Sequence, residues 1–300
     1  MKNNRLFAGL GFLMILLVLF ACRKSISNAQ RQSLRPIGSD SLLTVNSDNP
    51  AVPIVPFPQS PLVGCSNNPN YGDSIVYPQP TNGQDDIIHP VNNPGAGKYL
   101  SWPAGLLIDS LTGAIDLTTS EAGQKYAIGF VQKGTTDTCI SSLIVGGASY
   151  MDSIYVLNEG AWLAFPYFDA DPDMPSICGT PPNGSAGCSF DVTGSATNHK
   201  MVIDKSTGVI DLKRSLNGIF GAHPVNGQMA AITIYYQLND ASNLALQHLQ
   251  VDIVYYDNKS AMNLGLVDKI RNKHAQELAG QLILPSANPR PPLIVIIRTL

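Results

Sequence analysis

Paired aspartates occur in a fourteen-residue stretch that the chain contains twice. Residues 107–120 read LIDSLTGAIDLTTS, and residues 202–215, 95 positions later, read VIDKSTGVIDLKRS. Eight of the fourteen positions are identical, including both aspartates of each copy. Carboxylates at a fixed spacing can bind a hard cation or serve as an acid and a base. This stretch is therefore the first place to look for chemistry.

The same residues also have the pattern of a tight turn between two short strands. Asp109 is placed to cap the turn through its side chain, and Gly113 to supply the positive φ near its end. Ile115 and Leu117 alternate with Asp116, as in a half-buried strand. The pattern favours a β-hairpin whose aspartates form the turn. A ligand role for the aspartate pairs is the alternative.

A second acidic pattern places Asp169, Asp171 and Asp173 at alternate positions. The spacing D-x-D-x-D opens a calcium loop, in which oxygen ligands converge on the cation. An EF-hand also needs Gly at its sixth position and Glu at its twelfth, where this chain has Met174 and Thr180. We therefore predict a solvated acidic linker, with a Ca²⁺ site at the three aspartates as the alternative. No other cofactor is expected.

Common catalytic signatures are missing from the sequence. It has no Gly-x-Ser-x-Gly nucleophile elbow and no HExxH, and its histidines (89, 199, 223, 248 and 274) show no metal-ligand spacing. We therefore predict no catalytic residues. A hydrolase that uses Asp carboxylates in a cleft between two modules remains the enzymatic alternative, because active sites assemble from distant residues.

Aromatic residues near predicted strand ends are the candidate ligand contacts. Trp102 and Trp162 are expected to anchor the core, and stacking on a sugar ring is the alternative. If the ligand is a glycan, we expect Trp162, Tyr167 and Phe168 to contact it.

The amino end predicts export. Lys2 and Arg5 precede an apolar run of about 15 residues, which is shorter than the roughly 20 that a membrane-spanning helix needs. The run ends Leu-Phe-Ala-Cys22, which resembles a bacterial lipoprotein signal. The resemblance implies removal of residues 1–21 and lipidation of Cys22, so that the protein is anchored in the cell envelope, with the outer membrane as the expected site. Which leaflet it faces stays open.

Charge excludes nucleic acid as an expected partner. The full chain carries a net charge of −3, and removal of the signal takes away two basic residues. No basic cluster is left that could make the several phosphate contacts that nucleic-acid affinity needs. The expected partners are the membrane, through the lipid, and a protein or polysaccharide at the cell surface.

Four further cysteines predict disulfides, because an even number in an exported chain is typical of cross-linking. Three connectivities are possible. We favour Cys178–Cys188, which closes a Gly- and Pro-rich loop, with Cys65–Cys139 as the other pair. No CxxC spacing supports a metal site at these cysteines.

The rest of the chain predicts a mainly β protein of two tandem Ig-like β-sandwich modules with a short C-terminal helix and strand. The expected parts are a Pro- and Ser-rich tether (22–62), a first module (63–165), a linker with a disulfide loop (166–188), a second module (189–257) and an extension (258–300). Residues 153–157 are expected to end the first module. Leu264, Val267 and Ile270 have helical spacing, and residues 293–297 form an apolar strand that must be paired to avoid aggregation.

The hairpin residues carry a family resemblance. Gly105-Leu106-Leu107-Ile108-Asp109, followed by Thr112-Gly113 and later by Gly123 and Tyr126, resembles the cadherin-like and putative Ig modules of bacterial surface proteins. The resemblance implies β-sandwiches that serve as spacers or adhesive domains. The sequence thus predicts a membrane-anchored, non-catalytic module for binding, adhesion or structure; the alternative is a carbohydrate-binding protein or an Asp-based glycan hydrolase.

Overall fold

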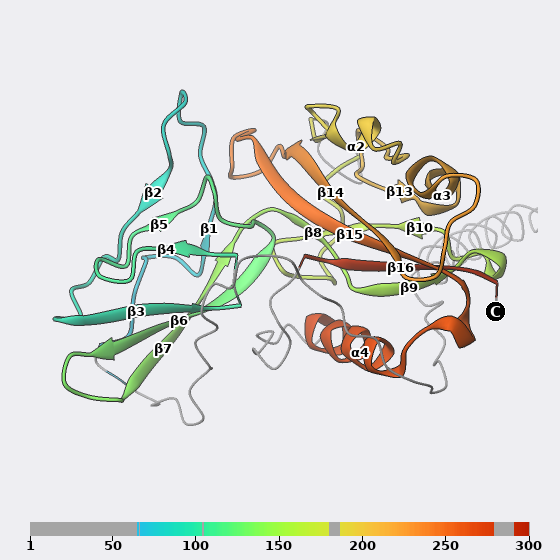
Figure 1. The fold of residues 1–300 in the computed structure, drawn as a ribbon. Helices are drawn as coiled ribbons and strands as arrows, with labels where there is room; N and C mark the ends of the chain where they lie inside the picture. The colour runs from blue at the N-terminus through green and yellow to red at the C-terminus, as the bar shows by residue number, and fades with distance from the viewer. Residues whose placement is uncertain (1–64, 66, 104, 180–186, 279–290, 300) are drawn as a thin grey trace, which may run out of the picture. The chain divides into compact units, whose positions relative to one another are not determined.

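The computed structural model describes residues 65, 67–103, 105–179, 187–278 and 291–299 (Figure 1). The signal, Cys22 and the tether lie outside the described residues. Within the described part of the chain, no helix is long and apolar enough to cross a membrane. The fold is mainly β, with several sheets and three short α-helices in that part.

The first sheet has the strand order β1-β7-β6-β3. Its strands are β1 (Ile75–Val76), β3 (Gly97–Trp102), β6 (Gln124–Gln132) and β7 (Thr138–Val145). The predicted face of β6 is confirmed, because Tyr126, Ile128 and Phe130 are all buried. Trp102 is also buried and is the core anchor that the sequence predicts. The three side chains on that face pack in one core cluster, and Ala127 and Gly129 on the other face of β6 are buried as well.

The repeated stretch contributes to a three-stranded sheet of order β2-β5-β4. These strands are β2 (Ile87–Ile88), β4 (Leu107–Ile108) and β5 (Ile115–Asp116). In register, Ile88 and Ile108 both pair with Ile115, which is completely buried. The predicted hairpin of the first copy is therefore confirmed.

The second copy forms the same turn but continues differently. Its hairpin is reduced to a bridge between Ile203 and Ile210, after which β13 (Ile210–Asp211) pairs with β10 (Leu163–Ala164). Helix α3 (Leu212–Phe220) follows directly, and the sequence pattern did not predict it. Asp211 caps the helix by accepting the Arg214 amide at 2.9 Å. The helix continues because Leu212, Leu216 and Phe220 recur at a spacing of four and are buried, a pattern absent after Asp116.

The largest sheet has the order β12-β14-β15-β16-β9. Its strands are β9 (Ser153–Val156), β12 (Ser189–Phe190), β14 (Gln228–Gln237), β15 (Gln247–Asn258) and β16 (Leu293–Thr299). Helices α2 (Ser195–Asn198) and α3 cover one face, and α4 (Leu264–Leu278) covers the other (Figure 1). The predicted helix α4 is confirmed, and it connects β15 to β16, which run parallel and so need a crossover.

The C-terminal strand is an inner strand, which corrects the expected extension at 258–300. β16 pairs in parallel with β15 on one side and with β9 on the other. Its residues Leu293 to Ile297 are all buried. The expectation that this apolar run is paired is confirmed, but the run is part of the core rather than an addition to it.

The expected boundaries at 165 and 188 are also wrong. β9, which was expected to end the first module, pairs with β16, and β10 pairs with β13. The expected linker begins with a strand, β11 (Pro166–Phe168), which pairs with β8 (Ala148–Tyr150). Residues 148–168 therefore belong structurally with the carboxy-terminal half. Their partners lie far along the chain, where local patterns give no information.

Candidate functional site

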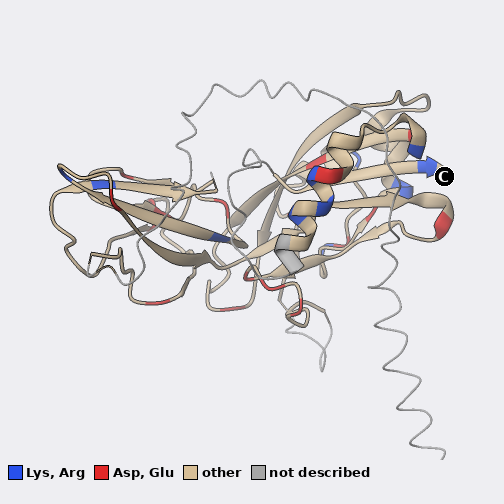
Figure 2. Ribbon diagram, turned by 90° about the horizontal axis from the view of Figure 1, so that it is seen from below, with Lys and Arg blue, Asp and Glu red and all other residues tan. Residues whose placement is uncertain are grey.

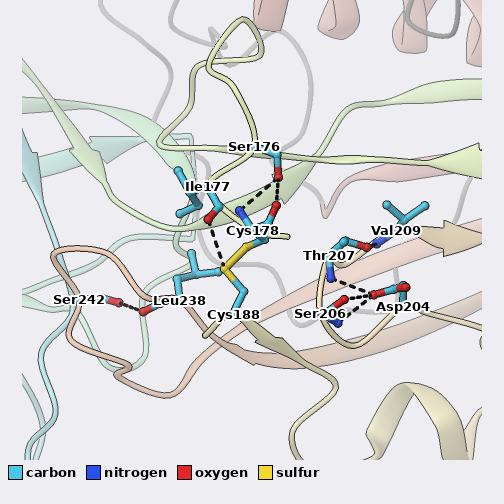
Figure 3. Close-up of a disulfide and its surroundings, with 10 residues drawn as sticks. All are labelled: Ser176, Ile177, Cys178, Cys188, Asp204, Ser206, Thr207, Val209, Leu238 and Ser242. Carbon is cyan, nitrogen blue, oxygen red and sulfur yellow. Dashed lines mark hydrogen bonds between the residues drawn. A yellow bond between two sulfur atoms is a disulfide. The ribbon is translucent and has the colours of Figure 1, made fainter. Parts of the chain in front are cut away.

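The first aspartate of each repeat is occupied by its own turn. Asp109 Oδ1 accepts the amides of Leu111 at 2.9 Å and Thr112 at 2.7 Å, and the Thr112 hydroxyl at 2.9 Å. Asp204 Oδ1 accepts the amide and hydroxyl of Ser206 at 2.9 and 2.7 Å, and the Thr207 amide at 3.0 Å (Figure 3). The two carboxylates therefore act as turn formers.

These hydrogen bonds lower the pKa of both carboxyl groups. For Asp109 the main cause is the hydrogen bond from the Thr112 amide, and for Asp204 it is the one from the Ser206 hydroxyl. Each bond favours the ionised form. An aspartate held ionised by several donors is a stable cap and a poor general base.

The glycine of each turn lies against an aromatic ring. Gly113 and Gly208 have φ of 72° and 73°, the left-handed region that favours glycine. The Gly113 carbonyl accepts the Tyr71 hydroxyl at 2.6 Å, and the Gly208 carbonyl accepts the Tyr150 hydroxyl. Both turns are therefore docked on the body of the protein in the same way.

The last identical residue of each repeat closes the motif. Ser120 donates to the Asp116 carbonyl at 2.6 Å and accepts the Leu107 amide at 2.9 Å. Ser215 makes the equivalent bonds, to the Asp211 carbonyl at 2.6 Å and from the Val202 amide at 2.8 Å. These hydrogen bonds explain in structural terms why both copies of the repeat have a serine at this position.

Asp169, Asp171 and Asp173, the residues of the calcium alternative, do not form a metal-binding cluster in the described part of the chain. Asp169 accepts the Tyr77 hydroxyl at 2.8 Å and the Gly147 amide at 2.9 Å, and burial raises the pKa of its carboxyl group. Asp171 instead accepts the Asp173 amide at 3.0 Å. Over the described ranges, no group of three or more His, Cys, Asp or Glu side chains could hold a metal ion. Asp169 is buried directly after β11, whereas Asp171 and Asp173 are exposed.

Two of the three expected ligand contacts are buried. Tyr167 and Phe168 have exposed fractions of 6% and 0% and lie in β11, so neither can present its ring to a glycan. Both residues fall in the predicted linker, but they form a strand whose pairing with β8 buries them.

Trp162 differs, because it is partly exposed while it packs on the core. Lys213 of α3 places its Nζ 5.0 Å from the centre of the Trp162 ring, a cation–π distance. The Leu212 amide donates to the Trp162 carbonyl at 2.8 Å, which fixes the loop on α3. Phe165 nearby in the chain is 48% exposed. Trp162 and Phe165 are therefore the aromatic residues of this segment that solvent reaches.

Both favoured cysteine pairs are disulfides in the structure. Cys178–Cys188 closes a short loop (Figure 3), and Cys65–Cys139 spans 74 residues. The Ser176 hydroxyl accepts the Cys178 amide at 3.3 Å and donates to its carbonyl at 3.1 Å. A short closed loop of this kind restricts the unfolded chain.

Asp152 and Lys273 form a buried ion pair that the sequence pattern did not predict. Lys273 Nζ lies 3.1 Å from Asp152 Oδ1. Charged residues of both signs follow one another along α4 (Figure 2), which hid the difference between exposed Lys269 and buried Lys273. The spacing along α4 does indicate that Lys273 is buried. Lys273 is three residues after buried Ile270 and so lies on the packed face of the helix.

Comparisons with known proteins do not place the chain in a family. No family model matches it, and no curated protein is similar to it. Among solved structures, Drosophila N-cadherin EC1-4 has a TM-score of 0.19 and 8% sequence identity. The alignment covers 56% of this chain and 44% of that chain, so this chain spans less than half of that structure.

Proposed function

We propose that the protein is a lipid-anchored, non-catalytic module of the bacterial cell envelope, with a role in binding, adhesion or structure. The observation that carries the proposal is the use of its most conspicuous carboxylates. Asp109 and Asp204 each hold one turn, and Asp169 holds two protein donors. Carboxylates that could do chemistry instead accept hydrogen bonds that hold the structure together. This pattern is expected of a scaffold or binding module.

Two related, mainly β modules are the proposed architecture. The equivalent bonds of Ser120 and Ser215, and of the hydroxyls of Tyr71 and Tyr150, support a common ancestry of the two halves. In both halves an aromatic pair joins neighbouring strands, Tyr99 with Phe130 and Phe190 with Tyr236.

Carbohydrate binding is the second candidate, and the partly exposed ring of Trp162 favours it. Aromatic faces present apolar area at a low cost in conformational entropy, and Lys213 holds this ring in place. An Asp-based hydrolase gains no comparable support, because both oxygens of Asp169 accept protein donors.

Replacement of Trp162 tests the binding proposal. In a glycan array with the purified protein, we expect Trp162→Ala to weaken any binding at least tenfold, because the stacking face is lost. Leu111→Ala serves as the control, since Leu111 is 71% exposed on another part of the chain. Binding that survives Trp162→Ala, or an array without binding, would remove the carbohydrate version.

Replacement of Cys22 tests the anchor. We expect Cys22→Ser to abolish labelling by a radioactive fatty acid and to shift the protein from the membrane fraction to the soluble fraction, because no lipid acceptor remains. Arg23→Ser is the matched control and should stay labelled. An unlabelled wild-type chain would contradict lipid anchoring.

A further inference from the structure

Asn-Gly pairs recur along the chain, and the structure places them in different surroundings. Asn82-Gly83, Asn217-Gly218 and Asn226-Gly227 lie among the described residues, and the pair at 183–184 lies outside them. In such a pair the glycine nitrogen can attack the side-chain carbonyl carbon of the asparagine, because glycine has no Cβ to obstruct the approach. The rate depends on how freely the two groups can meet.

At Asn82-Gly83 both reacting groups are available. The pair lies in an exposed turn between β1 and β2, in which the Gln84 amide donates to the Thr81 carbonyl at 2.7 Å. In the described part of the chain, neither the Asn82 carboxamide nor the Gly83 amide makes a hydrogen bond. Nothing lies within 4 Å of a Cβ added at Gly83, so the backbone has room to bring the two groups together.

Asn226-Gly227 lies in a turn with the same Asn-Gly-Gln sequence, but its reacting groups are engaged. The Gln228 amide closes this turn by donating to the Val225 carbonyl at 3.0 Å. Asn226 Oδ1 accepts the Asp257 amide at 2.6 Å. The Gly227 amide donates to the Tyr255 carbonyl at 2.8 Å. Attack at this pair would have to break both of these hydrogen bonds.

Asn217-Gly218 is restrained by the helix that contains it. Both residues lie in α3, and the Asn217 carbonyl accepts the Gly221 amide at 3.0 Å. A Cβ added at Gly218 would lie 2.7 Å from the Lys200 Cβ, so this segment also packs closely on its neighbour. The regular helical hydrogen-bond pattern therefore holds the Gly218 nitrogen away from the side-chain carbon.

We propose that Asn82 is a site of self-modification, at which the chain converts asparagine to aspartate and isoaspartate. The Gly83 nitrogen forms a bond to Cγ of Asn82, and the bond from Cγ to Nδ2 breaks. The proton of the Gly83 amide leaves with Nδ2 as ammonia. Water then adds to either carbonyl carbon of the cyclic imide and opens the ring. Water is the only other reactant, and no oxidant or reductant takes part.

The conversion adds negative charge to the surface and leaves the core unchanged. The new carboxyl group lies three residues before Asp85, in a part of the chain that is exposed from Asn82 to Asp85. The Gln79 amide donates to Asp86 Oδ2 at 2.7 Å, a hydrogen bond that closes this segment without involving the reacting pair. The converted chain should therefore stay folded as a more acidic form with the same melting temperature.

Peptide mapping of the purified full chain after incubation at mildly alkaline pH tests the proposal. We expect conversion at Asn82 to be at least tenfold faster than at Asn217 and Asn226, because the fold leaves only the first of these pairs unrestrained. In denaturant the three sites should convert at similar rates, since each asparagine precedes glycine. Equal rates at Asn82 and Asn226 in the folded chain would overturn the proposal, and so would an Asn82 that reacts only in denaturant.

Matched variants test the attack by the Gly83 nitrogen. Gly83→Ala should slow conversion at Asn82 at least tenfold, because a Cβ on the attacking residue obstructs the approach. Gly134→Ala, at another exposed glycine with nothing within 4 Å of an added Cβ, should leave the rate at Asn82 unchanged. Asn82→Asp provides the reference for one of the two products in anion-exchange chromatography. An unchanged rate in Gly83→Ala would overturn attack by this nitrogen.

Discussion

Replacing Gly208 by alanine is expected to lower the free energy of unfolding by about 2–5 kcal/mol, as measured by chemical denaturation. Gly208 has φ of 73°, where a side chain costs roughly 1–2 kcal/mol. A Cβ there would also lie 2.6 Å from the Phe190 ring, and overpacking of a core adds about 1–3 kcal/mol. The ring cannot easily move, because it stacks on Tyr236 with 5.5 Å between ring centres.

Gly134 provides the matched control for this substitution. Its φ of 85° is similar, but nothing lies within 4 Å of a Cβ added there. Gly134→Ala should therefore cost only the backbone contribution of roughly 1–2 kcal/mol. Equal losses at Gly134 and Gly208 would contradict the close docking of the repeated turn.

Truncation of Ile296 to alanine is the second large expected effect. Ile296 is completely buried in β16, between β15 and β9, and it packs in the larger core. Loss of a buried isoleucine side chain typically costs about 2–5 kcal/mol, and an inner strand has little freedom to close the cavity. We expect the free energy of unfolding, obtained from the denaturation midpoint, to fall by an amount in that range.

Met229 is the control on the same sheet. It lies in β14 and is 49% exposed, so Met229→Ala should change the free energy of unfolding by no more than about 0.5 kcal/mol. If Ile296→Ala were as mild as Met229→Ala, β16 would not be an inner strand, and residues 258–300 would be an extension after all.

Local features of this fold could be predicted from the sequence. The turn at Asp109 and Gly113, the buried face of β6 and the helical spacing of α4 all depend on residues close together in the chain. Short-range sterics and side-chain alternation fix such features. The favoured Cys178–Cys188 pair follows from the same kind of short-range argument.

Features that depend on distant partners could not be predicted. Ser153–Val156 has the pattern of a strand, but nothing in it specifies pairing with β16. Ser153 pairs with Ile294, which lies 141 residues later in the chain. Burial of Tyr167 and Phe168 depends on pairing with β8, and the role of Lys273 depends on Asp152. Pairing and burial of this kind are set by tertiary structure, so the largest errors lay at the module boundary and at the candidate site.

The central claim is that the repeated aspartates hold turns and do not bind a ligand. Their lowered pKa values mean that the turns are stabilised at pH above the ordinary Asp value, and that this stabilisation is lost as the pH falls through the lower folded-state pKa. An NMR titration of the Asp109 and Asp204 carboxyl carbons, with and without Ca²⁺, measures this directly. We predict pKa values below that of an ordinary Asp, unchanged by Ca²⁺. Ordinary pKa values, or values that move when Ca²⁺ is added, would contradict the claim.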